Sequence, residues 1–333
     1  MTKIGIIGLG FMGGTHVAAY RQLMSVLDFE VTAVADINRE KADKTAELLG
    51  AKAYYSAQEL LDQADINTAD ICLPTFLHYE YASKAVSKGL NVFVEKPVCL
   101  NSTDAFALAK QAAEKNVFSQ VGQCIRFWTE YEYLKSVIDE GVYGKVKHIK
   151  LRRLSPRPMW GWNSWLLDDQ FSGGATLDLQ VHDADFALYL FGKPEKVKAF
   201  INHTGEKYAS IVSSLKYKDF TVMTEGSWDY PSSFPFEMSY IADFEKATVL
   251  FSSIHGLKVC PAGGDSFSPE LQKECSAQSD SGGNISDLGG YYNELFYFVD
   301  CINKGVQPVK ASLQAGAEAV ELTEKQKIAA DKD

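Results

Sequence analysis

Residues 4–13 read Ile4-Gly5-Ile6-Ile7-Gly8-Leu9-Gly10-Phe11-Met12-Gly13 and decide the fold of the first part of the chain. A short apolar run is followed by G-x-G-x-x-G, and the next residues have a helical pattern. A glycine turn between a strand and a helix is typical of a dinucleotide site, because the helix N-terminus offers N–H groups and partial positive charge to phosphates. We therefore predict that Gly8, Gly10, Phe11, Met12 and Gly13 bind a cofactor.

An acidic residue ends the next predicted strand, Val31–Ala35. Asp36 is placed to accept hydrogen bonds from the adenosine ribose hydroxyls and to repel a 2′-phosphate, which favours NAD. Arg39 lies close enough in sequence to hold such a phosphate, so NADP stays open. His16 either faces the sheet or belongs to the site, and the pattern does not separate the two.

The first part of the chain alternates short apolar runs with amphipathic stretches up to residue 122. This alternation predicts a doubly wound parallel sheet, an α/β Rossmann domain over residues 1–122. The predicted strands are Ile4–Ile7, Val31–Ala35, Ala53–Tyr55, Ile71–Leu73, Val92–Val94 and Ser119–Val121. The predicted helices cover 14–25, 39–49, 57–63, 79–88 and 102–115, with Asn38 and Asn101 as N-caps and Gly50 and Gly89 as C-terminal stops.

The pattern changes from residue 123 onward, where strands follow one another. It predicts an α+β domain over residues 123–333 with a large, mostly antiparallel, open-faced sheet. The predicted strands lie near 145–154, 195–203, 208–217, 219–229, 235–242 and 246–252, and the predicted helices near 129–140, 178–191, 288–304 and 312–329. Residues 260–288, rich in Gly, Ser, Asp and Pro, are expected to form a long surface excursion.

Composition and charge exclude several classes of protein. Hydrophobic residues make up 46% of the chain and charged ones 23%, as in a folded globular protein. The 33 Lys and Arg against 43 Asp and Glu give a net charge of -10, the wrong sign for nucleic acid or an anionic membrane. Without a signal peptide, an apolar span or a C-x-x-C pair, the chain is expected to be cytoplasmic with reduced cysteines.

A lysine follows the predicted strand Val92–Val94, in Glu95-Lys96-Pro97. Ligands of an open α/β sheet bind outside the carboxyl ends of its strands, so Lys96 is placed as a positive charge beside the cofactor. Pro97 forces the chain to leave the sheet and favours an extended Lys96. An isolated E-K-P would more often be a surface lysine before a loop.

A second group of polar residues follows the glycine pair Gly173-Gly174. If one helix begins near Asp178, then Asp178 and His182 lie on one face, and the carboxylate orients an imidazole suited to take a proton near neutral pH. A buried structural histidine with a capping aspartate is the alternative. No metal is expected here, because Asp183 points away and zinc prefers nitrogen and sulfur donors.

These three motifs, in this order, resemble the signature of the Gfo/Idh/MocA oxidoreductases, and the resemblance covers nearly the whole chain. It implies that Lys96 is the catalytic lysine and that Asp178 and His182 bind the reacting hydroxyl. It further implies cofactor contacts from Thr75, His78, Glu95 and Gln123. Substrate contacts are implied for Arg126 and Asn163, and for Tyr230 with less support. Trp162, in an aromatic loop before the glycines, suits a sugar face or a packing contact equally.

The resemblance implies an enzyme of EC 1.1.1 type that transfers a hydride between NAD(P) and a secondary alcohol or ketone of a sugar, inositol or related polyol. A glycoside hydrolase that recycles its NAD and a non-catalytic NAD sensor are the alternatives. A homodimer or homotetramer is expected to form through the second-domain sheet. The motifs specify neither the sugar nor the carbon that is oxidised.

Overall fold

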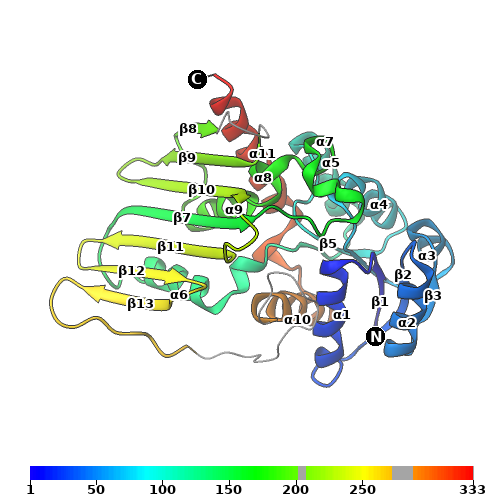
Figure 1. Cartoon of the computed structure of the whole chain (residues 1–333). Helices are drawn as coiled ribbons and strands as arrows, with labels where there is room; N and C mark the ends of the chain where they lie inside the picture. Colours follow the sequence, from blue (N-terminus) through cyan, green and yellow to red (C-terminus); the bar gives the residue numbers. More distant parts are fainter. Residues whose placement is uncertain (202–207, 272–287, 333) are drawn as a thin grey trace. The chain divides into compact units, whose positions relative to one another are not determined.

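The computed structural model describes residues 1–201, 208–271 and 288–332, which form two compact units (Figure 1). The first unit contains residues 1–127 and 288–317, and the second contains residues 128–271, without 202–207, and 318–332. Parts of two predictions lie outside the described residues: the end of the strand at 195–203 and positions 272–287 of the surface excursion.

The first unit is built on a six-stranded parallel sheet in the order β3-β2-β1-β4-β5-β6. The strands are β1 (Thr2–Ile7), β2 (Phe29–Ala35), β3 (Lys52–Tyr54), β4 (Thr68–Ile71), β5 (Asn91–Val94) and β6 (Ser119–Val121). Their nearly continuous burial explains why each is a flat apolar run in the sequence. The predicted doubly wound fold is confirmed, and its strand order reverses between β1 and β4, where ligands of such sheets bind.

The crossover helices are α1 (Phe11–Leu23), α2 (Arg39–Leu49), α3 (Ala57–Gln63), α4 (Thr75–Ser87) and α5 (Ser102–Lys115). The side chains of Asn38 and Asn101 accept the predicted N-cap bonds, and Gly50 ends α2 with a positive φ. Two starts were predicted too late. Helix α1 begins directly after Gly10, and α4 begins after Pro74, whose φ of -57° lets the chain enter the helix four residues before position 79.

The division between the units differs from the predicted boundary at 122/123. The first unit continues through the short helix η1 (Cys124–Phe127), and it also contains α10 (Gly289–Lys304) and η3 (Val309–Ala311) from the end of the chain. Helix α10 packs against α1, because Leu295, Phe298 and Val299 join the core of this unit. A stretch remote in sequence therefore completes the core of the first unit.

The second unit contains a seven-stranded sheet in the order β13-β12-β11-β7-β10-β9-β8. Only β7 and β10 pair in parallel, so the predicted, mostly antiparallel sheet is confirmed. The strands are β7 (Val146–Pro156), β8 (Lys196–Ile201), β9 (Ser210–Lys216), β10 (Thr221–Tyr230), β11 (Glu237–Phe244), β12 (Ala247–Ser252) and β13 (Gly256–Pro261). Strand β13 was not predicted, because its alternating pattern is short and merges with the polar stretch that follows.

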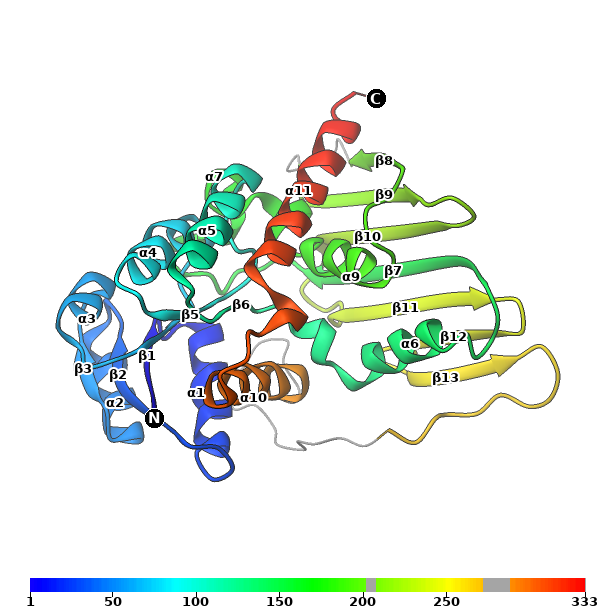
Figure 2. The same cartoon turned by 180° about the vertical axis from the view of Figure 1, so that it is seen from behind.

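Helices cover one face of this sheet (Figure 2), where Tyr131 of α6 packs edge-on against Tyr240 of β11 and α9 packs on β7 and β10. The helices of this unit are α6 (Thr129–Asp139), η2 (Trp162–Leu167), α7 (Asp169–Ser172), α8 (Gly174–Asp178), α9 (Val181–Phe191) and, from residue 318 onward, α11 (Leu313–Ala330). No helix in the described ranges is long and apolar enough to cross a membrane.

The single helix predicted over 178–191 is wrong, because Asp178 ends α8 and His182 lies in the first turn of α9. Between them the N–H of Gln180 donates to the carbonyl of Ala175, five residues back, at 2.8 Å. Such a bond adds a residue to the turn, as in a π-bulge. The side chain of Gln180 also hydrogen-bonds Thr224 of β10. The predicted i, i+4 relation of a regular helix therefore does not hold.

Candidate active site

The glycine turn where β1 leads into α1 contains the three glycines of the G-x-G-x-x-G motif. At two of them a side chain would collide with the backbone, and at the third there is open space beside the backbone. A Cβ at Gly8, where φ is +90°, would lie 2.6 Å from the carbonyl oxygen of Cys72. A Cβ at Gly13 would lie 1.9 Å from the carbonyl oxygen of Gly8. A Cβ at Gly10 would have no neighbour within 4 Å. The backbone at Gly10 and the N-terminus of α1 are therefore open to an anionic ligand.

Asp36 lies at the end of β2, beside this turn. Its carboxylate accepts the N–H of Leu9 at 2.8 Å and the N–H of Asn38 at 2.7 Å. These two bonds fix the carboxylate where the ribose of a dinucleotide is held in this fold. Arg39 opens α2, and its guanidinium stacks 4.0 Å from the ring centroid of Tyr55.

Two buried polar side chains follow β4 and β6, the strands on either side of β5, at the same edge of the sheet. Thr75, after β4, begins α4, and Gln123 follows β6. The hydroxyl of Thr75 and both amide atoms of Gln123 are buried without a hydrogen-bond partner among the described residues. Buried polar groups are almost always paired, so these atoms are suited to hydrogen-bond a bound ligand. With the open backbone at Gly10 and the fixed Asp36, the residues fit NAD.

Lys96 follows β5 at this edge and is partly buried, and its peptide bond to Pro97 is cis. The N–H of Lys96 donates to the Glu95 carboxylate at 3.0 Å. His78, predicted to contact the cofactor, is buried: its Nδ1 lies 2.7 Å from the carbonyl of Pro97 and its Nε2 2.6 Å from that of Leu73. Burial lowers the pKa of His78. Its ring thus connects the loops that follow β4 and β5.

Arg126, predicted to contact substrate, lies in η1 and is buried in the first unit. Its Nη1 donates to the carbonyl of Lys310 at 2.6 Å. This bond ties η1 to η3, so the guanidinium has a structural contact in addition to any contact with substrate.

In the second unit, His182 is buried in the first turn of α9, and Asp178 is partly buried at the end of α8. The neighbouring Asp183 pairs with Arg153 of β7 at 3.4 Å, and burial raises the pKa of its carboxyl. This ion pair and the Gln180–Thr224 bond attach the start of α9 to the sheet. The imidazole of His182 is therefore carried by a firmly anchored turn.

The aromatic loop before the glycine pair presents Trp162 and Asn163 next to each other. Trp162 is 55% exposed, and Asn163 and Ser164 have positive φ values of 48° and 55°. Consecutive non-glycine residues in this region are strained, and such strain is concentrated at ligand sites. Tyr230 ends β10 and stacks on Phe234 with ring centroids 4.2 Å apart.

Two sequence models of one family match the chain. The model described as an oxidoreductase family with an NAD-binding Rossmann fold matches residues 2–123. The Gfo/Idh/MocA C-terminal domain model matches residues 131–249. The chain belongs to the Gfo/Idh/MocA oxidoreductase family.

Named relatives in this family include two inositol dehydrogenases. The chain is 29% identical to myo-inositol 2-dehydrogenase of Thermotoga maritima over 57% of its own length and 55% of that protein. It is 25% identical to scyllo-inositol 2-dehydrogenase (NAD(+)) of Bacillus subtilis over 94% of its length and 90% of that protein. The match thus spans little more than half of the first relative and nearly all of the second.

A solved structure shares the fold of the whole chain. The WlbA dehydrogenase of Bordetella pertussis, in complex with NADH and UDP-GlcNAcA, superposes with a TM-score of 0.81 at 19% identity. The alignment covers 99% of this chain and 96% of that one. That structure therefore shares the fold of this chain, with both its parallel sheet and its mixed sheet.

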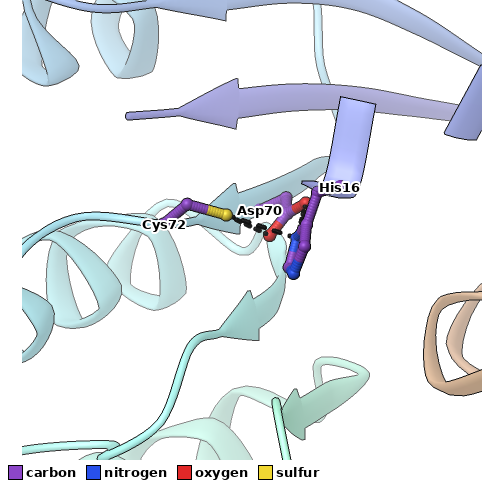
Figure 3. A group of neighbouring side chains, drawn as sticks. All are labelled: His16, Asp70 and Cys72. Atoms are coloured by element: carbon purple, nitrogen blue, oxygen red, sulfur yellow. Dashed lines mark hydrogen bonds and ion pairs between the residues drawn. The ribbon is translucent and has the colours of Figure 1, made fainter. Parts of the chain in front are cut away.

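The sequence did not predict one cluster of buried polar side chains in this Gfo/Idh/MocA chain. His16, Asp70 and Cys72 lie together in the first unit (Figure 3), with Glu95 and Glu294 beside the same imidazole. A polar side chain inside the apolar face of α1 was the one available signal, and it predicted no partner. The carboxylates come from β4, from the end of β5 and from α10, which pattern and spacing do not connect.

Proposed function

We propose that the chain is an NAD-dependent dehydrogenase that transfers a hydride between the nicotinamide and a secondary alcohol or ketone of a sugar, an inositol or a related polyol. The first unit would bind NAD, and the second would bind the substrate and a further copy of the chain. The observation that carries the proposal is the position of Lys96, at the sheet edge where Thr75 and Gln123 bury polar atoms without partners. The named inositol dehydrogenases among its relatives support the substrate class.

The choice of NAD over NADP rests on Asp36. Its carboxylate is held by two backbone N–H groups next to the glycine turn, so it would repel a 2′-phosphate and accept bonds from ribose hydroxyls. Arg39, the residue that would favour NADP, has its guanidinium stacked on Tyr55.

The chemistry follows from the charges of three side chains. Bound NAD supplies an acceptor for the hydride that leaves the carbinol carbon. His182 takes the hydroxyl proton, Lys96 polarises the oxygen and stabilises its developing negative charge, and Asp178 orients the substrate. The carbinol C–H and O–H bonds break, and a ketone forms. In reduction, His182 returns the proton.

The experiment is a screen of inositols, aldoses, keto-sugars and glycosides with NAD, following NADH absorbance. Stoichiometric NADH with a polyol or aldose is the expected result. Cleavage of a glycoside without net NADH, or tight NAD binding with no turnover of any compound, would contradict the proposal and favour a recycling hydrolase or a sensor.

Replacing Trp162 by alanine tests whether the aromatic loop binds substrate. Loss of an aromatic contact should raise the substrate KM by about 2- to 10-fold and leave the NAD KM unchanged. Met159→Ala removes another exposed apolar side chain nearby and is the matched control. Equal changes in both constants of the Trp162 variant would instead show that the indole packs within the protein.

A second copy of the chain is the proposed partner of the open sheet face. Among the described residues, no helix of the second unit covers this face (Figure 1), and Met223, Lys150 and Ile241 are paired side by side across β10, β7 and β11. Met223 and Ile241 are both exposed, as are Phe200 and Val212. Several exposed apolar side chains on one uncovered face of a sheet are typical of a subunit interface.

Ile241→Glu should convert the proposed dimer or tetramer into smaller species, because it buries a charge in the interface. Light scattering coupled to gel filtration gives the mass directly. The control is Ile254→Glu, at an exposed position between β12 and β13. A monomeric wild-type chain at micromolar concentration would contradict this part of the proposal.

A further inference from the structure

The buried imidazole of His16 lies between two carboxylates of the first unit. Its Nδ1 is 2.8 Å from Oδ2 of Asp70, and its Nε2 is 3.0 Å from Oε1 of Glu95. The thiol of Cys72 lies 3.2 Å from the same Nδ1 (Figure 3). The ring is fully buried and meets Phe93 edge-on at 5.3 Å, so water does not separate these groups.

This geometry sets the charge of the ring. An ionised carboxylate only accepts hydrogen bonds, so two such bonds require a proton on each ring nitrogen. Burial opposes the charged form, but Asp70 and Cys72 outweigh it and raise the pKa of His16 well above its ordinary value. Each ring nitrogen points to its own carboxylate at hydrogen-bond distance. A proton, rather than a metal ion, therefore lies between each nitrogen and its carboxylate. His16 is therefore an imidazolium that bridges two strands of the sheet.

Glu95 transmits this contact to the active-site lysine. One of its oxygens accepts from His16, and the other accepts the backbone N–H of Lys96 at 3.0 Å. The carboxylate also lies against Gly122, where a Cβ would come within 2.8 Å of Oε1. The Glu95 side chain is thus fixed from three directions, and it fixes the peptide that carries Lys96.

The nearby Glu294 of α10 balances the charges. Its side chain is fully buried, and neither carboxyl oxygen is hydrogen-bonded to a described residue. Burial and the neighbouring Glu95 raise the pKa of Glu294 well above its ordinary value. When Glu294 is neutral, the two negative charges of Asp70 and Glu95 are matched by the two positive charges of His16 and Lys96.

We propose that His16 is a positioning residue for Lys96, acting through the Glu95 carboxylate that it holds under the Lys96 peptide. The inference rests on the proposed function for the role of Lys96 in turnover, but the contact itself concerns the backbone alone. We call the contacts from His16 to Glu95 and from Glu95 to the Lys96 amide the Glu95 clamp. A catalytic group displaced by a fraction of an ångström loses much of its effect on a reaction, so loss of the clamp should lower kcat more than NAD affinity.

The test measures the Lys96 backbone without substrate. In chain labelled with 15N-lysine, the Lys96 amide is assigned by its disappearance in Lys96→Arg. His16→Gln offers the glutamate at most one weaker bond, and hydrogen exchange at Lys96 should accelerate by about 10- to 100-fold, as expected for a lost charge-assisted bond. Exchange at Lys84, on the exposed side of α4, should not change. Glu95→Gln is the second variant, and we expect the same direction.

Turnover supplies the second readout. His16→Gln should lower kcat by about 10- to 100-fold, as for other residues that orient a catalytic group, with NADH affinity unchanged. The matched control is Val17→Ala, which loses core packing on the same helix but leaves the Glu95 clamp in place. It should lower the Tm while preserving slow exchange at Lys96 and wild-type kcat.

Wild-type exchange at Lys96 in both variants would overturn the inference, as would equal acceleration in Val17→Ala. An unchanged kcat in a His16 variant whose Lys96 amide has lost its protection would overturn it as well. Failure of the proposed function is distinguishable, because it would leave the wild-type chain without polyol turnover while the exchange result still decides the clamp.

Discussion

Lys96→Ala is expected to lower kcat on the polyol substrate by about 10²- to 10⁴-fold, the range lost with a positioned acid, base or charge. Lys96 follows β5 at the ligand-binding edge of the sheet, and its peptide is held by Glu95. The variant lacks the positive charge that stabilises the developing alkoxide. The glycine turn and Asp36 are untouched, so NADH binding, measured by nicotinamide fluorescence, should stay within about threefold of wild type.

Two further variants separate charge from general damage. Lys96→Arg keeps the charge but presents a planar, less adaptable group, so it should recover only part of the rate. Lys84→Ala removes an exposed lysine that pairs with Glu80 on α4 and should have no effect on either constant. A Lys96→Ala enzyme with more than about a tenth of the wild-type kcat would show that this charge does little in the reaction.

The order of strands and helices in the nucleotide-binding fold could be predicted because local signals and tertiary contacts agree there. Ile4–Ile7 is flat and apolar because both faces of β1 are buried, and Asn38 caps α2 by a bond that its residue type alone suggests. The glycine spacing places Gly8 and Gly13 at two close backbone approaches. Each of these depends on residues within a short stretch of chain.

The remaining features depend on contacts between distant segments. Asp178 and His182 have helical spacing, but the Gln180 side chain bonds to Thr224 and a wider turn divides the helix. Helix α10 has an ordinary amphipathic pattern, which does not specify that it packs on α1 in the first unit. The same limit hid the carboxylates around His16.

Gly13→Ala is expected to disrupt the nucleotide turn itself. The added Cβ would lie 1.9 Å from the Gly8 carbonyl oxygen and 2.9 Å from its carbon, contacts that the backbone relieves only by moving. Overpacking of this kind costs about 1–3 kcal/mol, so the Tm of the NAD-free chain should fall by several degrees. NAD affinity should fall at least about tenfold, because α1 no longer presents its N–H groups to the pyrophosphate in the same place. An unchanged Tm would show that the turn tolerates a wider approach of α1 to β1.

Gly10→Ala tests whether a glycine is needed at this position for NAD binding, because folding does not require one there. Gly10 has a φ of -71°, which alanine adopts readily, and a Cβ there meets nothing within 4 Å. The free energy of unfolding of the NAD-free variant should therefore lie within about 0.5 kcal/mol of wild type, and its Tm should be nearly unchanged. The methyl group would nevertheless occupy the space through which a pyrophosphate reaches the backbone, so NAD affinity should fall about tenfold or more. The two variants add the same methyl group at positions three residues apart. If only Gly13→Ala loses stability while both variants lose NAD affinity, the pyrophosphate lies over Gly10. Wild-type NAD affinity in Gly10→Ala would exclude that position.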